Sequence, residues 1–146
     1  MSLLPKKYIV SGDSNSDHRG IVRYVNQFNL DSIKRFYTIT HHQIDFARAW
    51  QGHKYESKYF HVVKGSFLIN WIKVDSWTLP SKNLNIQAII LIETEPEILV
   101  IPQGHVTGLK ALIPDSTLVI FSDATLEASQ SDDYRYDNNY WDMVTP

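Results

Sequence analysis

Two short stretches carry most of the side chains that could do chemistry. The first runs from Arg48 through Gln51 and His53 to Lys58, and the second is Ile-Pro-Gln-Gly-His-Val-Thr-Gly at residues 101–108. Histidine titrates near neutral pH and can move a proton. A lysine can stabilise a developing oxyanion, and an arginine can bind phosphate through two parallel hydrogen bonds. These residue types favour an anionic or carbonyl-bearing organic ligand.

The elements around these stretches are predicted to be β-strands. The first stretch reads as a strand and a turn, followed by a return strand, Tyr59–Val63, that ends at Gly65. In the second, a strand at Ile98–Ile101 meets a Pro-x-Gly turn that leads into a new strand. Two such units, separated by a loop and a further strand, would bring polar residues from distant parts of the sequence into the mouth of a small β-barrel.

The rest of the chain predicts an all-β protein with about ten short strands. Residues 33–40 alternate polar and apolar side chains. Residues 66–74 also read as a strand, with Phe67, Ile69 and Trp71 on one face and Leu68, Asn70 and Ile72 on the other, and Phe67 and Trp71 should face the core. Residues 11–16 are predicted to be a turn, 75–85 a surface loop and 126–131 a short helix. We expect a single domain over residues 1–146, folded as a double-sheet jelly roll.

Composition excludes several classes of function. The formal net charge is −2 and the charges are interspersed, so nothing indicates binding to nucleic acid or to an anionic membrane. There is no cysteine, which excludes a disulfide or a thiol nucleophile. No apolar run approaches the roughly 20 residues that a membrane span requires. We therefore expect a soluble, cytoplasmic protein.

Five blocks of sequence, taken together, carry a resemblance to a known family. The blocks are Asp17-x-Arg19-Gly20, Ile33-Lys34-Arg35, Arg48 to Lys54, Ile101-Pro-x-Gly104 and Asp132-Asp133-Tyr134-Arg135. In this order and spacing they resemble the metal-free cupins that isomerise or epimerise dTDP-4-keto-6-deoxyhexoses. The 3,4-ketoisomerases, with the centre R-G-x-H-x-H-K, are the closer relatives, and the dTDP-4-dehydrorhamnose 3,5-epimerases, with R-G-L-H, are more distant.

The resemblance also predicts a cupin without metal or other cofactor. Metal-binding cupins place four ligands in H-x-H-x4-E-x6-G and P-x-G-x2-H, and these positions are Gln51, His53, Lys58 and Thr107 here. One imidazole is too few for a divalent ion, and the ammonium of Lys58 would repel it. A metal-dependent cupin in which His105 supplies a second ligand remains the weaker alternative.

What the resemblance implies for the reaction is a proton shuttle next to a ketone. His53 would be the base, Lys58 the oxyanion stabiliser and Gln51 an orienting hydrogen-bonding group. The predicted substrate and nucleotide contacts are Arg48, Arg19, His105 and Thr107. The implied ligand is a dTDP-linked 4-keto-6-deoxy sugar, used in bacterial surface polysaccharide biosynthesis, and the implied assembly is a homodimer.

Two departures from the family pattern support an alternative function. The first family histidine is Gln51, which cannot accept a proton at neutral pH, and the general-acid tyrosine of the epimerases aligns with Phe121. A non-catalytic cupin that binds a nucleotide sugar or another carbohydrate would tolerate both changes. An isomerase or epimerase and a binding module are therefore both compatible with the sequence.

Overall fold

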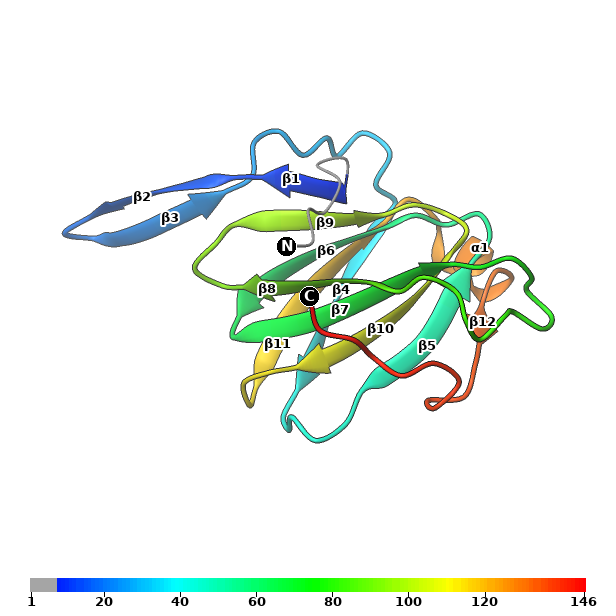
Figure 1. The fold of residues 1–146 in the computed structure, drawn as a ribbon. Helices are drawn as coiled ribbons and strands as arrows, with labels where there is room; N and C mark the ends of the chain where they lie inside the picture. The colour runs from blue at the N-terminus through cyan, green and yellow to red at the C-terminus, as the bar shows by residue number, and fades with distance from the viewer. Residues whose placement is uncertain (1–7) are drawn as a thin grey trace.

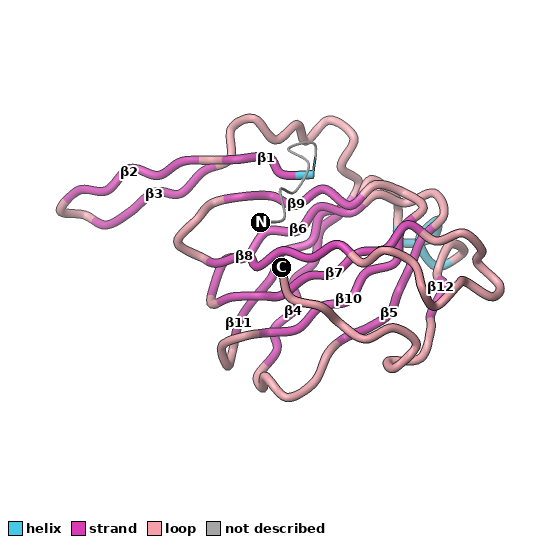
Figure 2. The backbone as a smooth tube through the Cα atoms, in the orientation of Figure 1, coloured by secondary structure: helices cyan, strands magenta, loops and turns pink. Residues whose placement is uncertain are grey.

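The structure, a computed structural model that describes residues 8–146, consists of two antiparallel sheets packed face to face. A two-stranded hairpin projects away from them (Figure 1). Strands and loops make up nearly the whole chain, as Figure 2 shows. The predicted all-β, double-sheet jelly roll is confirmed.

Each main sheet has five strands. The first sheet has the order β1 (Ile9–Ser11), β9 (Glu97–Ile101), β6 (Lys58–Lys64), β11 (Ser116–Ser122) and β4 (Arg35–His41). The second has the order β12 (Tyr134–Arg135), β5 (Arg48–His53), β10 (His105–Ala111), β7 (Ser66–Lys73) and β8 (Gln87–Ile92). Every neighbouring pair is antiparallel. The two predicted functional stretches become neighbours, because β5 pairs with β10.

The main core lies between the two sheets and follows from the period-2 pattern of the strands. Along β6 and β11 every second side chain points inward, as Phe60, Val62, Leu118 and Ile120 do. Phe67 and Trp71 are fully buried in the same cluster, as predicted. The apolar core occupies part of the interior, and a polar region remains that is lined by Arg35 and residues 37–40 of β4, residues 48–51 of β5 and Lys58 of β6.

A second apolar cluster covers the outer face of the second sheet. The C-terminal tail crosses this face, and its Trp141 packs edge-to-face on Trp50 with the ring centroids 5.5 Å apart. Asn70 fixes the tail through two hydrogen bonds to the backbone of Val144, of 3.0 and 2.8 Å. Both faces of β7 are therefore buried, which explains why no residue from 66 to 72 is exposed.

The projecting hairpin consists of β2 (Asp13–Asp17) and β3 (Gly20–Tyr24), and we call it the arm. Residues 11–16 were predicted to be a turn, and that prediction is wrong: Asp13 to Asp17 pair with residues 20–24. Polar, turn-forming residues occupy this strand because neither of its faces packs on the body of the protein (Figure 1). The pairing partner, and not the local sequence, decides the structure here.

The turns at Gly65 and Gly104 and the short helix form as predicted. Gly65 and Gly104 have φ values of 75° and 88°, a region that favours glycine because it has no Cβ. The helix α1 (Leu126–Gln130) begins after Thr125, whose side chain accepts a hydrogen bond from the Ala128 N–H. No helix within residues 8–146 is long and apolar enough to cross a membrane.

Candidate active site

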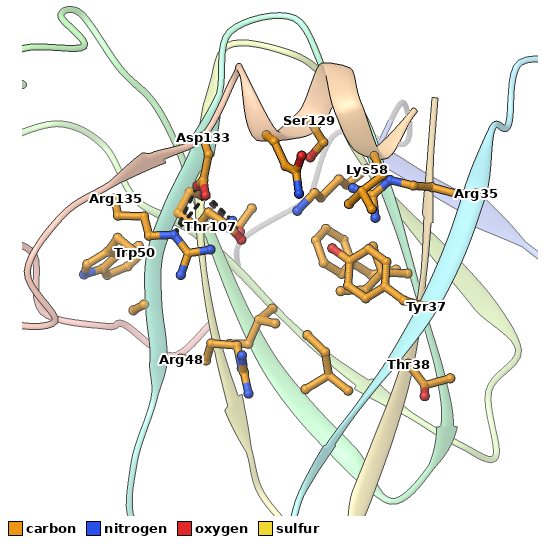
Figure 3. A pocket seen from close by; sticks show the side chains of 18 of the residues that line it. Arg35, Tyr37, Thr38, Arg48, Trp50, Lys58, Thr107, Ser129, Asp133 and Arg135 are labelled. Atoms are coloured by element: carbon orange, nitrogen blue, oxygen red, sulfur yellow. Dashed lines mark hydrogen bonds and ion pairs between the residues drawn. The ribbon is translucent and has the colours of Figure 1, made fainter. Parts of the chain in front are cut away.

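A cavity of about 630 Å³ opens between the two sheets, at the side where the tail and α1 return to the body (Figure 3). Four strands contribute most of its polar wall: β4, β5, β6 and β10. The lining side chains that carry charge or can exchange a proton are Arg35, Tyr37, Arg48, Lys58, Asp133, Arg135 and Tyr136. Of the predicted site residues, Arg48, Gln51, Lys58 and Thr107 line this cavity.

Positive charge dominates one part of the wall, where Arg35 and Lys58 flank the ring of Tyr37 (Figure 3). The Arg35 Cζ lies 5.1 Å and the Lys58 Nζ 5.6 Å from the ring centroid, within the range of cation–π contacts. Lys58 is only 6% exposed, and its ammonium makes no ion pair with any residue that the structure describes. Burying a charge without a partner is costly, so this region suits an anionic ligand or a developing oxyanion.

Arg48 is held at the other side of the cavity by a buried histidine. Its Nε donates a 3.4 Å hydrogen bond to Nε2 of His41, whose ring lies between Phe46 and Phe67. Burial lowers the pKa of His41, and the positive charge of Arg48 lowers it further. A neutral imidazole can accept the hydrogen bond that fixes the guanidinium, whereas an imidazolium could not.

The wall at β5 and β10 carries Gln51 and Thr107, which are direct partners across the two strands. The Thr107 hydroxyl donates to the Gln51 carbonyl at 3.4 Å. The Gln51 side-chain amide donates to Oδ1 of Asp133 at 3.0 Å, and Arg135 Nε donates to both oxygens of the same carboxylate at 3.2 and 3.1 Å (Figure 3). A cross-strand network thus connects β5 to the tail at the cavity.

His53 lies under the cavity wall and does not line it. Its Nδ1 is 2.6 Å from the Asp132 carbonyl, which can only accept, so Nδ1 carries the proton and Nε2 keeps its lone pair. Nε2 is buried and has no hydrogen-bond partner in the described part of the chain. Burial, and then the charge of Lys58, lowers the pKa of His53, while Glu56 and Asp132 act in the opposite direction. The imidazole is therefore neutral at neutral pH.

A buried carboxylate supports this histidine. Glu56 is 3% exposed, and one of its oxygens accepts from the Ser122 hydroxyl at 2.6 Å and from Arg35 at 3.4 Å. Its other oxygen lies 3.4 Å from Nδ1 of His53. This chain of contacts places a negative charge beside the protonated nitrogen of the ring, on the side away from the free Nε2.

Two predicted contact residues do not lie at the cavity. His105 pairs with His53 across the strands, but its Nδ1 lies 2.9 and 3.2 Å from the carbonyls of Pro102 and Gln103, so it supports the turn. Arg19 is on the arm, where it pairs with Asp17 at 2.7 Å and its side chain is 79% exposed. Neither side chain belongs to the cavity wall of the chain that carries it.

Sequence reasoning missed five charged or phenolic lining residues and misjudged the position of Phe121. The five residues without an assigned role in the site are Arg35, Tyr37, Asp133, Arg135 and Tyr136, although Arg35, Asp133 and Arg135 stand in the blocks that carry the family resemblance. Phe121, which aligned with the catalytic tyrosine of the epimerases, packs outside against Phe28 and Phe36. Its missing hydroxyl therefore says nothing about the site, which has the phenol of Tyr37 in its wall instead.

No group of three or more histidine, aspartate or glutamate side chains within residues 8–146 could hold a metal ion. The four positions that align with the ligands of metal-binding cupins supply one imidazole, an amide, an ammonium and a hydroxyl. Gln51 faces Asp133, His53 lies behind the wall, and Lys58 extends over Tyr37. This donor set does not fit a divalent cation.

Comparison with known proteins points to one group of structures. No protein-family model matches the chain, and no curated protein matches it significantly in sequence. A 3,4-ketoisomerase from Helicobacter canadensis superposes with a TM-score of 0.68 at 20% identity, over 90% of this chain and 92% of that one. The sugar 3,4-ketoisomerase QdtA from Thermoanaerobacterium thermosaccharolyticum, solved with TDP, gives 0.68 at 18% identity over 90% and 89%.

The epimerases are represented as well. ChmJ, a 3'-monoepimerase from Streptomyces bikiniensis solved with dTDP-quinovose, gives a TM-score of 0.72 at 14% identity, over 88% of this chain and 68% of that one. The fold is thus the cupin-type jelly roll that these ketoisomerases and epimerases of dTDP sugars share. The motif resemblance predicted this fold.

Proposed function

We propose that the cavity binds a dTDP-linked 4-keto-6-deoxy sugar and that the protein isomerises or epimerises it. The observation that carries this proposal is the cluster of cations in the cavity wall. Arg35, Arg48, Lys58 and Arg135 face a space that contains one lining carboxylate, Asp133. A nucleoside diphosphate brings the complementary negative charge, and arginine binds phosphate bidentately.

The catalytic roles follow from the protonation states in the site. His53 is proposed as the base, because its Nε2 keeps a lone pair while Nδ1 is fixed by Asp132. Lys58 would stabilise the enolate oxygen, and the phenol of Tyr37 can return a proton. Because Nε2 of His53 is enclosed, contact with substrate requires a side chain of the cavity wall to move.

A second candidate function is a non-catalytic cupin that binds the same class of ligand. The enclosed Nε2 of His53 and the amide of Gln51, where relatives of this kind carry a histidine, favour it. Both candidates predict that dTDP binds, and they differ only in proton exchange on the sugar. The proposed product would serve bacterial surface polysaccharide biosynthesis in the cytoplasm, as the resemblance implies.

Calorimetric titration with dTDP tests the shared part of the proposal. We expect Arg48→Ala to weaken binding roughly 10- to 100-fold, because a hydrogen bond to a charged group contributes about 1.5–3 kcal/mol. Lys64→Ala is the control, since Lys64 is exposed at the end of β6 and lies outside the cavity. If dTDP does not bind the wild-type protein, both candidates are wrong.

The arm supports the predicted homodimer. An isolated two-stranded hairpin is marginally stable in water, and this one exposes Ile21 and Val22, 47% and 64% accessible. We propose that it packs against a second copy of the chain and that Arg19 then contacts the cavity between the sheets of that copy. Sedimentation equilibrium should give twice the chain mass of 16.9 kDa. A monomer at micromolar concentration would contradict the dimer and, with it, the role of Arg19.

A further inference from the structure

We propose that Gln51 recognises a hydroxyl group of the bound sugar through its side-chain carbonyl oxygen, and that Asp133 is the positioning residue that orients it. The inference rests on the proposed function for the class of ligand. It adds a specificity determinant at the position where the relatives' motif has a histidine.

The orientation of the amide is fixed by chemistry. Oδ1 of Asp133 lies 3.0 Å from Nε2 of Gln51, and an ionised carboxylate only accepts, so the NH₂ group must face it. The carbonyl oxygen, Oε1, then points away from Asp133, on the opposite side of the Cγ–Cδ axis. No hydrogen bond joins Oε1 to another residue within the range 8–146, and Gln51 lines the cavity. Oε1 is the group that Gln51 can offer to a ligand.

The carboxylate stays ionised around neutral pH. Burial by itself would raise the pKa of Asp133, but the hydrogen bonds from Gln51 and Arg135 outweigh burial and lower it. Arg135 stands directly opposite Gln51 in the β12–β5 pairing, so the backbone holds the three groups together. The amide cannot turn around without placing its carbonyl against a negative charge.

A fixed acceptor discriminates between ligands. A sugar hydroxyl can donate to Oε1, whereas a ketone, a fluorine or a methylene at the same place cannot, and it would leave Oε1 desolvated without a partner. A histidine at position 51 could either donate or accept, depending on its tautomer. In this chain the same place in the cavity therefore selects a ligand that carries a hydroxyl there.

The test compares the binding of dTDP-glucose with analogues in which fluorine replaces one ring hydroxyl at a time. Fluorine cannot donate a hydrogen bond, so we expect one analogue to bind the wild-type protein about tenfold more weakly, the loss of about one hydrogen bond. Gln51→Met has no acceptor of this kind, and Asp133→Ala frees the amide. In both variants the affinities for dTDP-glucose and for that analogue should differ by no more than about twofold. Asp142 is exposed in the tail and lies outside the cavity, so Asp142→Ala should keep the tenfold difference of the wild-type protein.

The dTDP affinity of each variant distinguishes a failure of this inference from a failure of the proposed function. If dTDP binds but no analogue is discriminated, or if Asp133→Ala and Gln51→Met discriminate as the wild-type protein does, this inference is overturned and the proposed function is not. If the wild-type protein binds neither dTDP nor dTDP-glucose, both are overturned. A loss of dTDP binding in Asp133→Ala alone leaves Gln51→Met to decide.

Discussion

At the scale of single residues, the polar end of the interior depends on how three charges act on His53. Burial and the ammonium of Lys58 lower the pKa of its imidazole, while the carboxylates of Glu56 and Asp132 raise it. The net effect keeps the ring neutral, which a base requires. Lys58 therefore has two roles in the proposed mechanism: it stabilises the oxyanion and it keeps His53 unprotonated.

Removing one charge at a time should move the pKa of His53 in opposite directions. Lys58→Met removes a positive charge and should raise this pKa, whereas Glu56→Gln removes a negative charge and should lower it. NMR titration of the ring resonances measures both shifts. Lys64→Met, on the exposed end of the same strand as Lys58, should leave the pKa unchanged. An unchanged pKa in Lys58→Met would show that the two groups do not interact.

At the scale of elements, the site depends on the segment that leads from α1 into β12. The buried Asp132 accepts hydrogen bonds from the backbone N–H groups of Lys54, Tyr55 and Glu56, at 2.8, 2.8 and 3.1 Å, and its carbonyl accepts from His53. One residue of the tail thus holds both the turn after β5 and the ring of the proposed base. Residues almost 80 positions apart in sequence are joined at the cavity.

Asp132→Ala should destabilise the fold and disturb the site together. Hydrogen bonds to a charged group contribute about 1.5–3 kcal/mol each, and the three N–H groups would lose their acceptor, so we expect the free energy of unfolding to fall by about 3 kcal/mol or more. Urea denaturation measures the change. Asp142→Ala, an exposed aspartate in the tail, should change it by less than about 0.5 kcal/mol. Equal effects of the two changes would contradict the role of Asp132.

The sequence predicted the strands whose pattern is local and missed what depends on distant partners. The alternation in residues 33–40 marks β4, which meets the core with one face, and the apolar residues on both faces of 66–74 mark β7, which is buried on both faces. β2 has no such pattern and forms only through its pairing with β3. The motifs likewise predicted that Arg48, Gln51, Lys58 and Thr107 belong to one site, and all four line the same cavity.

Other parts of the site could not be derived from local sequence. Asp133 and Arg135 reach the cavity through the return of the tail to β5, and nothing near them in sequence indicates that pairing. His105 has the right spacing from Thr107 to share its face, but the turn carbonyls of Pro102 and Gln103 hold its ring. Arg19 has a motif around it but lies on an arm that leaves the body of the same chain.

At the scale of the whole molecule, two buried neutral histidines should make stability depend on pH. The pKa values of His41 and His53 are both lowered in the folded protein, so the folded state binds fewer protons than the unfolded state. The free energy of unfolding should therefore fall as pH drops below about 6.5, the ordinary pKa of histidine. The carboxyl pKa values of Asp17, Asp75 and Asp133 are also lowered, so these groups lose their contribution to the free energy of unfolding only at more acidic pH.

Urea denaturation measures this dependence between about pH 7.5 and 5. This range extends on the order of one unit to either side of the ordinary histidine pKa. His41→Phe should reduce the slope of stability against pH, since a phenylalanine can pack between Phe46 and Phe67 without titrating. His18→Asn, a change of an exposed histidine on the arm, should leave the slope as it is. A slope that does not change in His41→Phe would mean that His41 does not contribute.

Incorporation of solvent deuterium into dTDP-4-keto-6-deoxyglucose tests the proposed reaction most directly. We predict that the wild-type protein exchanges hydrogen at a carbon next to the ketone, and that His53→Asn slows this exchange by about 10² to 10⁴, the usual contribution of a general base. dTDP affinity should stay within a few fold of the wild-type value. Exchange at the wild-type rate in His53→Asn, or no exchange by either protein, would contradict the account.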